Sequence, residues 1–341
     1  LFHDNDVSMV QSAKITKNQY ICRKKEQQIA MVQSKEQLPY NDMGQWLKRL
    51  FPFKVQKISI DAGFSCPNRD GSKGHGGCTF CDNQTFNPSY CEPKDNIKTQ
   101  LERGKLFFSR KYPDMKYLAY FQAYSNTYAP VDVLKHRYEE ALAVDGVVGL
   151  VIGTRPDCVN DETLDYLAEL SKRTFLLVEY GIESTNNKVL QRINRHHTFE
   201  CGRDAVVKSH ERGIMTGAHF ILGLPGEEID EWKKQAEKVS KMPIDVLKLH
   251  QLQIVRNTPL AQQYIEQPFA LYSLNEYIST IANYLEHLRP SIVVDRFVSQ
   301  SPKGMVLAPQ WGIKNHEFVD KLKQFMFRNN MFQGKKWEEC Y

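Results

Sequence analysis

VVGLVIGT, residues 147–154, is an unbroken run of apolar residues and glycines that ends in a threonine. A strand with one face in water alternates apolar and polar residues, whereas a strand covered on both faces is apolar throughout. Strands of the second kind belong to parallel sheets that are packed against helices. This stretch therefore predicts a parallel α/β fold.

Strand-like and helix-like segments alternate on both sides of this run. The strand-like segments, rich in β-branched and aromatic residues, span residues 55–61, 116–124, 147–154, 174–182, 214–225 and 244–255. Helical segments separate them, and one of these begins with the capping residue Asn160. Six strand–helix alternations predict a parallel sheet with helices outside it, either an open barrel or a flat doubly wound sheet.

The chain divides into three predicted regions. Residues 1–40 are polar and charged, and we expect an irregular extension there. Residues 41–256 contain the alternating strands and helices. Residues 257–341 form a predicted small α/β appendage, which contains a segment of helical periodicity followed by SIVVDRF, a candidate further strand at residues 291–297.

The composition describes a globular protein with a mildly basic surface. Of the 341 residues, 41% are hydrophobic and 25% are charged, and the net charge is +5. This charge is too small to establish a nucleic-acid partner, although it is compatible with one. No run of about 18 apolar residues predicts a transmembrane helix, and no secretory signal is visible. The eight cysteines do not resemble a disulfide framework, so we expect a cytoplasmic protein without a membrane partner.

The segment GFSCPNRDGSKGHGGCTFCDN, residues 63–83, contains three cysteines and five glycines. Cys66, Cys78 and Cys81 have the spacing C-x11-C-x2-C, and such thiols bind metals. Spacing alone leaves three alternatives open. They are a structural zinc site with His75 or Cys91 as fourth ligand, a 4Fe–4S cluster with three protein ligands, and a fully ligated cluster, which would require a fourth cysteine.

The position of this loop favours a reactive site. It follows the first predicted strand, and ligands of parallel α/β folds bind at the carboxyl ends of the strands. Zinc ribbons have a second C-x2-C pair, which this sequence lacks. A cluster held by three cysteines keeps one iron free to bind a substrate or a cofactor.

The loop and the later motifs resemble the radical S-adenosylmethionine (SAM) enzymes. The most specific motif is CPNRDGSKGHGGCTFC, residues 66–81, and the resemblance extends over about residues 45–327. It is strongest to an uncharacterised bacterial group with the same CPNRDG and GGCxFC motifs. It extends to the radical SAM domain of the elongator catalytic subunit and to oxygen-independent coproporphyrinogen oxidase. The resemblance implies a partial TIM-like (β/α)6 barrel, with residues 41–256 as the radical SAM core and 257–341 as an associated appendage.

The resemblance also implies roles for individual residues. Cys66, Cys78 and Cys81 would bind three irons of a 4Fe–4S cluster, and SAM would bind the fourth. Five further residues occupy positions that contact SAM in the family: Phe80, Gln122, Glu183, Arg195 and Ile221. Gln122 lies in QAYSNT, residues 122–127, where the family has a Gly-Gly-Glu-like segment, so this sequence departs from the pattern there.

Ordinary structural roles remain open for several of these residues. Arg195 is also compatible with a solvated cation at a helix end, Glu183 with a helix cap, and Phe80 with a core aromatic. His219 is compatible with a core histidine whose hydrogen bonds are satisfied. We expect His196 and His197 to be solvated.

In this family a reduced cluster donates one electron to SAM, and the products are methionine and a 5′-deoxyadenosyl radical that abstracts hydrogen from the substrate. An electron donor such as flavodoxin or ferredoxin is implied as a partner, and the substrate class is an RNA or a small molecule. The basic, aromatic segments 107–112 and 315–330 suit RNA contact, or are ordinary helix surfaces. The alternative function is a zinc-stapled nucleic-acid-binding protein without catalysis.

Overall fold

The structure is a computed structural model that describes residues 38–82, 88–92, 94–109, 114–228, 230–299, 301–302 and 304–338. All but the last three residues of the predicted extension 1–40 lie outside the described residues.

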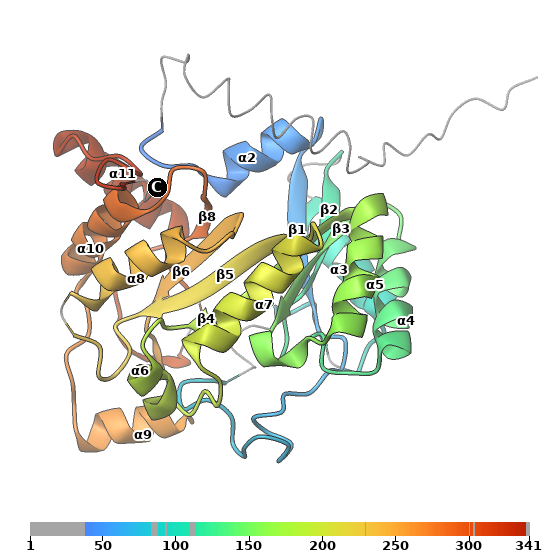
Figure 1. Cartoon of the computed structure of the whole chain (residues 1–341), viewed down its shortest axis with the longest axis horizontal. Coiled ribbons are helices and arrows are strands. Elements are labelled where there is room, and N and C mark those ends of the chain that lie inside the picture. Colours follow the sequence, from blue (N-terminus) through green and yellow to red (C-terminus); the bar gives the residue numbers. More distant parts are fainter. Residues whose placement is uncertain are drawn as a thin grey trace, which may run out of the picture.

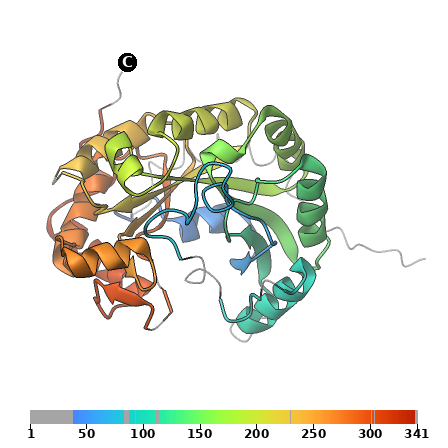
Figure 2. The ribbon, with the colours of Figure 1, turned by 90° about the horizontal axis from the view of Figure 1, so that it is seen from below.

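Seven parallel strands form a curled sheet, an incomplete barrel (Figures 1 and 2). The order in the sheet is β1 (Val55–Ile60), β2 (Lys116–Phe121), β3 (Val147–Thr154), β4 (Phe175–Glu183), β5 (Met215–Leu222), β6 (Val246–Gln251) and β8 (Val293–Arg296). The strands lie side by side in the order in which they occur along the chain, so each crossover places the next strand of the sheet beside the previous one. The predicted α/β partial barrel is confirmed.

The outer face of the sheet is covered by helices, which pack on the apolar residues that point away from the barrel interior (Figure 2). These helices are α3 (Ile97–Ser109), α4 (Val131–Leu142), α5 (Asp161–Arg173), α6 (Asn187–Arg192), α7 (Phe199–Glu211), α8 (Glu231–Ser240) and α10 (Leu274–His287). The predicted cap is present, because the Asn160 side chain accepts a hydrogen bond from the Thr163 amide at the start of α5.

The amino-terminal end of the barrel is filled by a helix, α2 (Met43–Leu50). Its buried residues Met43, Trp46 and Leu50 form one apolar cluster with residues on the inner face of the strands, Leu118, Val151, Leu177, Met215, Val246 and Val293. In Figure 2, α2 lies behind the sheet, on the side opposite the cysteine loop. The barrel is therefore closed at one end, and its inner face is accessible from the other.

The carboxyl-terminal region, predicted as a small α/β appendage, contributes one strand to the main sheet. The candidate strand in SIVVDRF is β8, which pairs in parallel with β6. Val293 packs inside the barrel and Val294 packs under the outer helices, so both apolar residues are buried when β8 pairs with β6. The sheet thus has a seventh strand beyond the six predicted.

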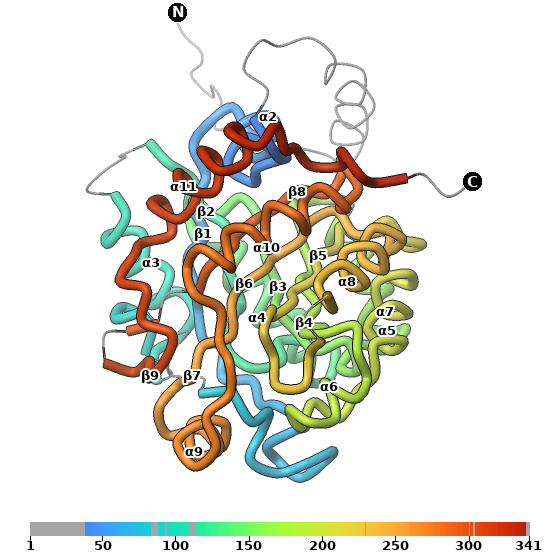
Figure 3. The backbone as a smooth tube through the Cα atoms, turned by 90° about the vertical axis from the view of Figure 1, so that its left-hand side faces the viewer, coloured from blue at the N-terminus to red at the C-terminus, as the bar shows by residue number. Residues whose placement is uncertain are grey.

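The rest of this region forms a cover along one side of the barrel (Figure 3). It contains α9 (Pro259–Glu266), α11 (Asn315–Arg328) and a two-stranded antiparallel sheet of β7 (Ile254–Val255) and β9 (Val306–Ala308). Tyr277 of α10 and Phe318 of α11 are fully buried against each other. None of the described helices has the length and apolar character needed to span a membrane.

Candidate active site

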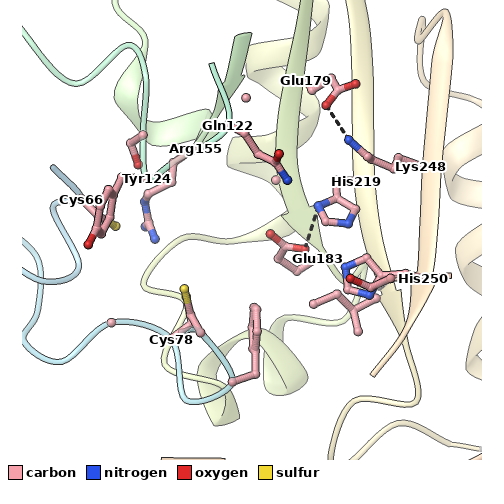
Figure 4. A pocket seen from close by; sticks show the side chains of 18 of the residues that line it. Cys66, Cys78, Gln122, Tyr124, Arg155, Glu179, Glu183, His219, Lys248 and His250 are labelled. Atoms are coloured by element: carbon pink, nitrogen blue, oxygen red, sulfur yellow. Dashed lines mark hydrogen bonds and ion pairs between the residues drawn. The ribbon is translucent and has the colours of Figure 1, made fainter. Parts of the chain in front are cut away.

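A pocket opens at the carboxyl ends of the strands, with about 1200 Å³ of space when its open mouth is included. All eight residues predicted for the site line it: Cys66, Phe80, Cys78, Cys81, Gln122, Glu183, Arg195 and Ile221. Figure 4 shows Cys66 and Cys78 on one side of the pocket and side chains from β4, β5 and β6 on the other.

The cysteine loop is fixed to the turn that follows α6. The Thr79 amide donates to the Ile193 carbonyl at 3.0 Å, and the Asn194 side chain donates to the Gly77 carbonyl at 2.8 Å. Gly77 has φ +84°, and a Cβ there would lie 2.9 Å from the Arg69 side chain. Glycine is favoured at this bend, because other residues rarely adopt this backbone conformation.

The three loop cysteines are free thiols that line one pocket. Within the described ranges, no three histidine, cysteine, aspartate or glutamate side chains are arranged to hold a single metal ion. In a 4Fe–4S cluster each thiolate binds a different iron, so the sulfurs need not converge on one point as they do around zinc. Three thiols at one pocket are a donor set that fits a 4Fe–4S cluster with one iron left for another ligand.

Cys78 has a polar environment that suits a metal-bound thiolate. Its sulfur lies 3.4 Å from Nη1 of Arg195 and 3.6 Å from Nδ2 of Asn68. Hydrogen bonds to a ligand sulfur stabilise negative charge on a cluster. Arg195 is buried, so it is not the solvated cation that the sequence also allowed.

Arg195 belongs to a chain of buried polar groups. Its guanidinium is 3.4 Å from the Glu183 carboxylate, and its Nε donates to His197 at 2.9 Å. Burial and the charge of Arg195 lower the pKa of His197 to about 3. His197 is half-buried and accepts this hydrogen bond as a neutral imidazole, so it is only partly solvated, whereas His196 is exposed as expected. The predicted contact of Arg195 with the SAM carboxylate stays a prediction.

Glu183 lies at an irregular end of β4. Gly181 pairs with His219 while Glu183 pairs with Phe220, so Ile182 is an extra residue in the strand. Glu183 has φ +73°, an uncommon value for a residue with a side chain and one often found at functional sites. A Cβ on Gly181 would lie 2.7 Å from the carboxylate of Glu183, so glycine makes room for it. Glu183 is not the cap of α6, which is Asn186.

Several buried polar atoms of the pocket lack a hydrogen-bond partner among the described residues. They include Nη1 of Arg155, Oε2 of Glu183, Nε2 of His219 and Nε of Arg296. His219 is thus not a core histidine with satisfied hydrogen bonds. Unpaired buried polar groups are costly, and a polar ligand such as SAM would supply the missing partners.

The floor of the pocket is a network of buried charges that the sequence analysis missed. Lys57 of β1 lies 3.2 Å from Glu179 of β4 and 2.8 Å from Asp295 of β8. Lys248 of β6 lies 2.9 Å from Glu179 and donates to the Tyr120 hydroxyl at 2.8 Å. Although burial alone would raise the pKa of Glu179, the two ammonium groups lower it well below its usual value. The pair Lys57–Asp295 joins the first and last strands of the sheet.

A sequence signal for this floor exists. Each residue is a charged side chain inside an otherwise apolar or alternating strand, as in VQKISI, FLLVEYGI, VLKLHQ and VVDR. Placed on the inner face of a barrel, such residues must meet one another, because water is excluded there.

Residues 70–239 match the profile of the Radical SAM superfamily, and residues 244–328 match that of the Radical_SAM C-terminal domain. A Bacillus subtilis relative, "Uncharacterized protein YtqA", is 36% identical over 296 residues, which is 87% of this chain and 92% of the relative. The chain belongs to the radical SAM superfamily. "Protein YhcC" of Escherichia coli is 36% identical over 272 residues, 80% of this chain and 87% of that protein.

Radical SAM membership assigns the cofactors, a 4Fe–4S cluster and SAM, and makes the chain an enzyme. The alternative of a zinc-stapled binding protein without catalysis is therefore wrong. The radical SAM fold is also seen in the solved structure of the archaeal Methanocaldococcus infernus Elp3, with a TM-score of 0.61 and 15% identity. That likeness covers 82% of this chain and 64% of the archaeal chain.

In this radical SAM site, replacement of Arg195 by glutamine is expected to lower the midpoint potential of the bound cluster by about 50 to 100 mV. The cation 3.4 Å from Cys78 favours the reduced, more negative cluster, and glutamine removes that charge. A redox titration followed by electron paramagnetic resonance, without SAM, measures the potential. Arg203→Gln, which removes an exposed guanidinium on α7, is the control. An unchanged potential in Arg195→Gln would contradict the prediction.

Proposed function

We propose that this pocket cleaves SAM reductively and directs the resulting 5′-deoxyadenosyl radical to a substrate bound in the barrel. The observation that carries the proposal is that three free thiols and all five predicted SAM-contacting residues line one pocket. Its open mouth lies at the carboxyl ends of the strands, and α2 fills the other end.

The cluster and SAM fit the residues that are present. When bound, the cluster supplies the single electron that breaks the sulfonium bond. Cys66, Cys78 and Cys81 would hold it, and Arg195 would stabilise the negative charge on Cys78. Glu183 would accept hydrogen bonds from SAM through Oε2, which lies 3.7 Å from Nδ1 of His219 and has no hydrogen-bond partner among the described residues. The buried walls would exclude water, which protects a reactive radical from side reactions.

The substrate and the electron donor are further parts of the proposal. A flavodoxin or ferredoxin would supply electrons from the cytoplasm. The described parts of the two segments considered for RNA contact contribute no residue to the pocket lining, and residues 110–112 lie outside the described part of the chain. We therefore favour a substrate that enters the pocket itself over one recognised through those two segments.

Anaerobic reconstitution tests the proposed function. The wild-type chain with iron, sulfide, dithionite and SAM is expected to bind about four irons and four sulfides. It should release 5′-deoxyadenosine and methionine in equal amounts, measured by liquid chromatography and mass spectrometry. A fully loaded cluster that yields no 5′-deoxyadenosine would reject the proposal.

A further inference from the structure

Arg296, the last residue of β8, is turned into the pocket by a β-bulge. Val293 points inward and Val294 points outward, so regular alternation would place Asp295 inside and Arg296 outside. Leu247 pairs with Val294, but Lys248 pairs with Arg296, which makes Asp295 an extra residue. The bulge thus gives both Asp295 and Arg296 access to the inner side, and Arg296 lines the pocket.

Arg296 differs from the other cations of the pocket because it has no ion-pair or hydrogen-bond partner among the described residues. Three cations pair with carboxylates, namely Arg155 with Asp157 at 2.9 Å, Arg195 with Glu183 at 3.4 Å and Lys248 with Glu179 at 2.9 Å. Arg69 donates to the Cys81 carbonyl within the cysteine loop. The described residues offer Arg296 neither an ion pair nor a hydrogen bond, and its Nε is buried. Asp295, the preceding residue, forms ion pairs with Lys57 and Lys248.

The field around Arg296 favours an anion. His219 and His250 line the same pocket as Arg296, and their ring centroids lie 4.6 Å from each other. Burial lowers the pKa of His250 to about 3, and the charges of Arg296 and Lys248 contribute to this shift. The pKa of His219 is also lowered, by burial, His250 and the same two cations. Both imidazoles are therefore neutral, and they offer hydrogen-bonding atoms without cancelling the positive charge.

The wall beside Arg296 is held in place by side chains. The Gln251 side chain accepts a hydrogen bond from the Ser299 amide at 3.2 Å, and the Gln253 side chain donates to the Ser299 carbonyl at 3.2 Å. These bonds join the segment after β8 to the end of β6 and the residues that follow it. A ligand at Arg296 would therefore bind to a preformed surface.

The cofactors leave the charge of Arg296 uncompensated. A 4Fe–4S cluster with three thiolates in its oxidised state carries about one negative charge, and SAM carries about one positive charge. Their sum is close to zero, so neither the cofactors nor the described protein balances Arg296. We propose that Arg296, with His219 and His250 beside it, binds an acidic group, a carboxylate or a phosphate, on the substrate of this enzyme. This inference rests on the proposed function, because it names the class of molecule that the radical would attack.

Equilibrium dialysis of the anaerobically reconstituted chain tests the subsite, with radiolabelled inorganic phosphate in one arm and malonate in the other. Each arm is measured first without SAM and then with saturating SAM, so that the SAM carboxylate occupies its own site in the second measurement. Wild type is expected to bind at least one of the two anions saturably, and the arm that binds more tightly distinguishes phosphate from carboxylate. Arg296→Gln is expected to lose about tenfold or more in affinity, since charged hydrogen bonds contribute strongly.

Two further variants make the result decisive. Arg212→Gln removes a guanidinium that is paired with Asp161 and Asp165 on the surface, and it should bind both anions like wild type. Arg296→Lys keeps the charge but loses the fork of donors, and an intermediate loss is expected. If Arg296→Gln does not fold, Arg296→Lys decides the question alone.

Three outcomes would overturn the inference. They are no saturable binding to wild type, equal binding by wild type and the folded Arg296 variants, and binding that disappears when SAM is added. The last would assign Arg296 to the carboxylate of SAM. Release of 5′-deoxyadenosine is measured in the same wild-type preparation. Anion binding without SAM cleavage rejects the proposed function, whereas cleavage without anion binding rejects only the subsite.

Discussion

Cys78→Ala is expected to lower the formation of 5′-deoxyadenosine by two orders of magnitude or more. Even residues that only orient a metal ligand contribute about 10- to 100-fold, and Cys78 would bind iron directly. Its sulfur receives the contacts of Arg195 and Asn68, so its loss also removes one of the two anionic partners of the buried Arg195 guanidinium, the other being Glu183. The measurements are iron and sulfide content, absorbance near 400 nm and the initial rate of SAM cleavage after anaerobic reconstitution.

Cys91→Ala is a matched control. Cys91 and Cys78 are each 5% exposed, so the two variants remove equally buried thiols. Cys91 donates to the Gln100 side chain and does not line the pocket. Its variant should keep its cluster and its rate of SAM cleavage. Equal cleavage by Cys78→Ala and wild type would remove Cys78 from the site, and loss of the cluster in Cys91→Ala would identify a fourth ligand.

Glu179→Gln is expected to destabilise the fold by about 3 to 5 kcal/mol, because it leaves two buried lysines facing one carboxylate. Glu179 is 5% exposed and bridges Lys57 and Lys248. For a chain of this size, the melting midpoint should fall by roughly 5 to 10 °C. Circular dichroism at a fixed scan rate measures it.

A second substitution separates charge imbalance from loss of packing. Glu179→Gln combined with Lys248→Met removes one charge of each sign and leaves Lys57 paired with Asp295 at 2.8 Å. The double variant is expected to recover most of the lost stability. Glu139→Gln, which breaks an exposed pair with Arg173, should cost less than about 1 kcal/mol. A melting midpoint of Glu179→Gln no lower than that of Glu139→Gln would refute the importance of the network.

The sequence predicted the order and type of most elements because each strand has a local signature. The apolar run at residues 147–154 is β3, buried on both faces apart from its ends. The seventh strand was assigned to an appendage because β8 has only four residues, and α9 and α10 separate it from β6. Its partner is chosen by packing between distant segments, which no local pattern encodes.

Prediction of the site was strongest where a motif is continuous. The three loop cysteines, Gln122 after β2, Glu183 at the end of β4 and Ile221 within β5 all line one pocket, and their contacts with the cluster and SAM stay predictions. The charged floor was missed because its four members lie on four different strands, and each alone resembles an ordinary polar residue. Arg296 was missed for a further reason, since a bulge reverses the side to which it points.

The helix that fills the amino-terminal end of the barrel has a consequence for large substrates. With Trp46 and its neighbours blocking the far exit, a polymer cannot thread through the molecule from one side to the other. Such a polymer could place only a free terminus, or a single monomer unit flipped out of the chain, at the reactive centre. The substrate therefore enters, and the product leaves, through the same opening at the carboxyl ends of the strands.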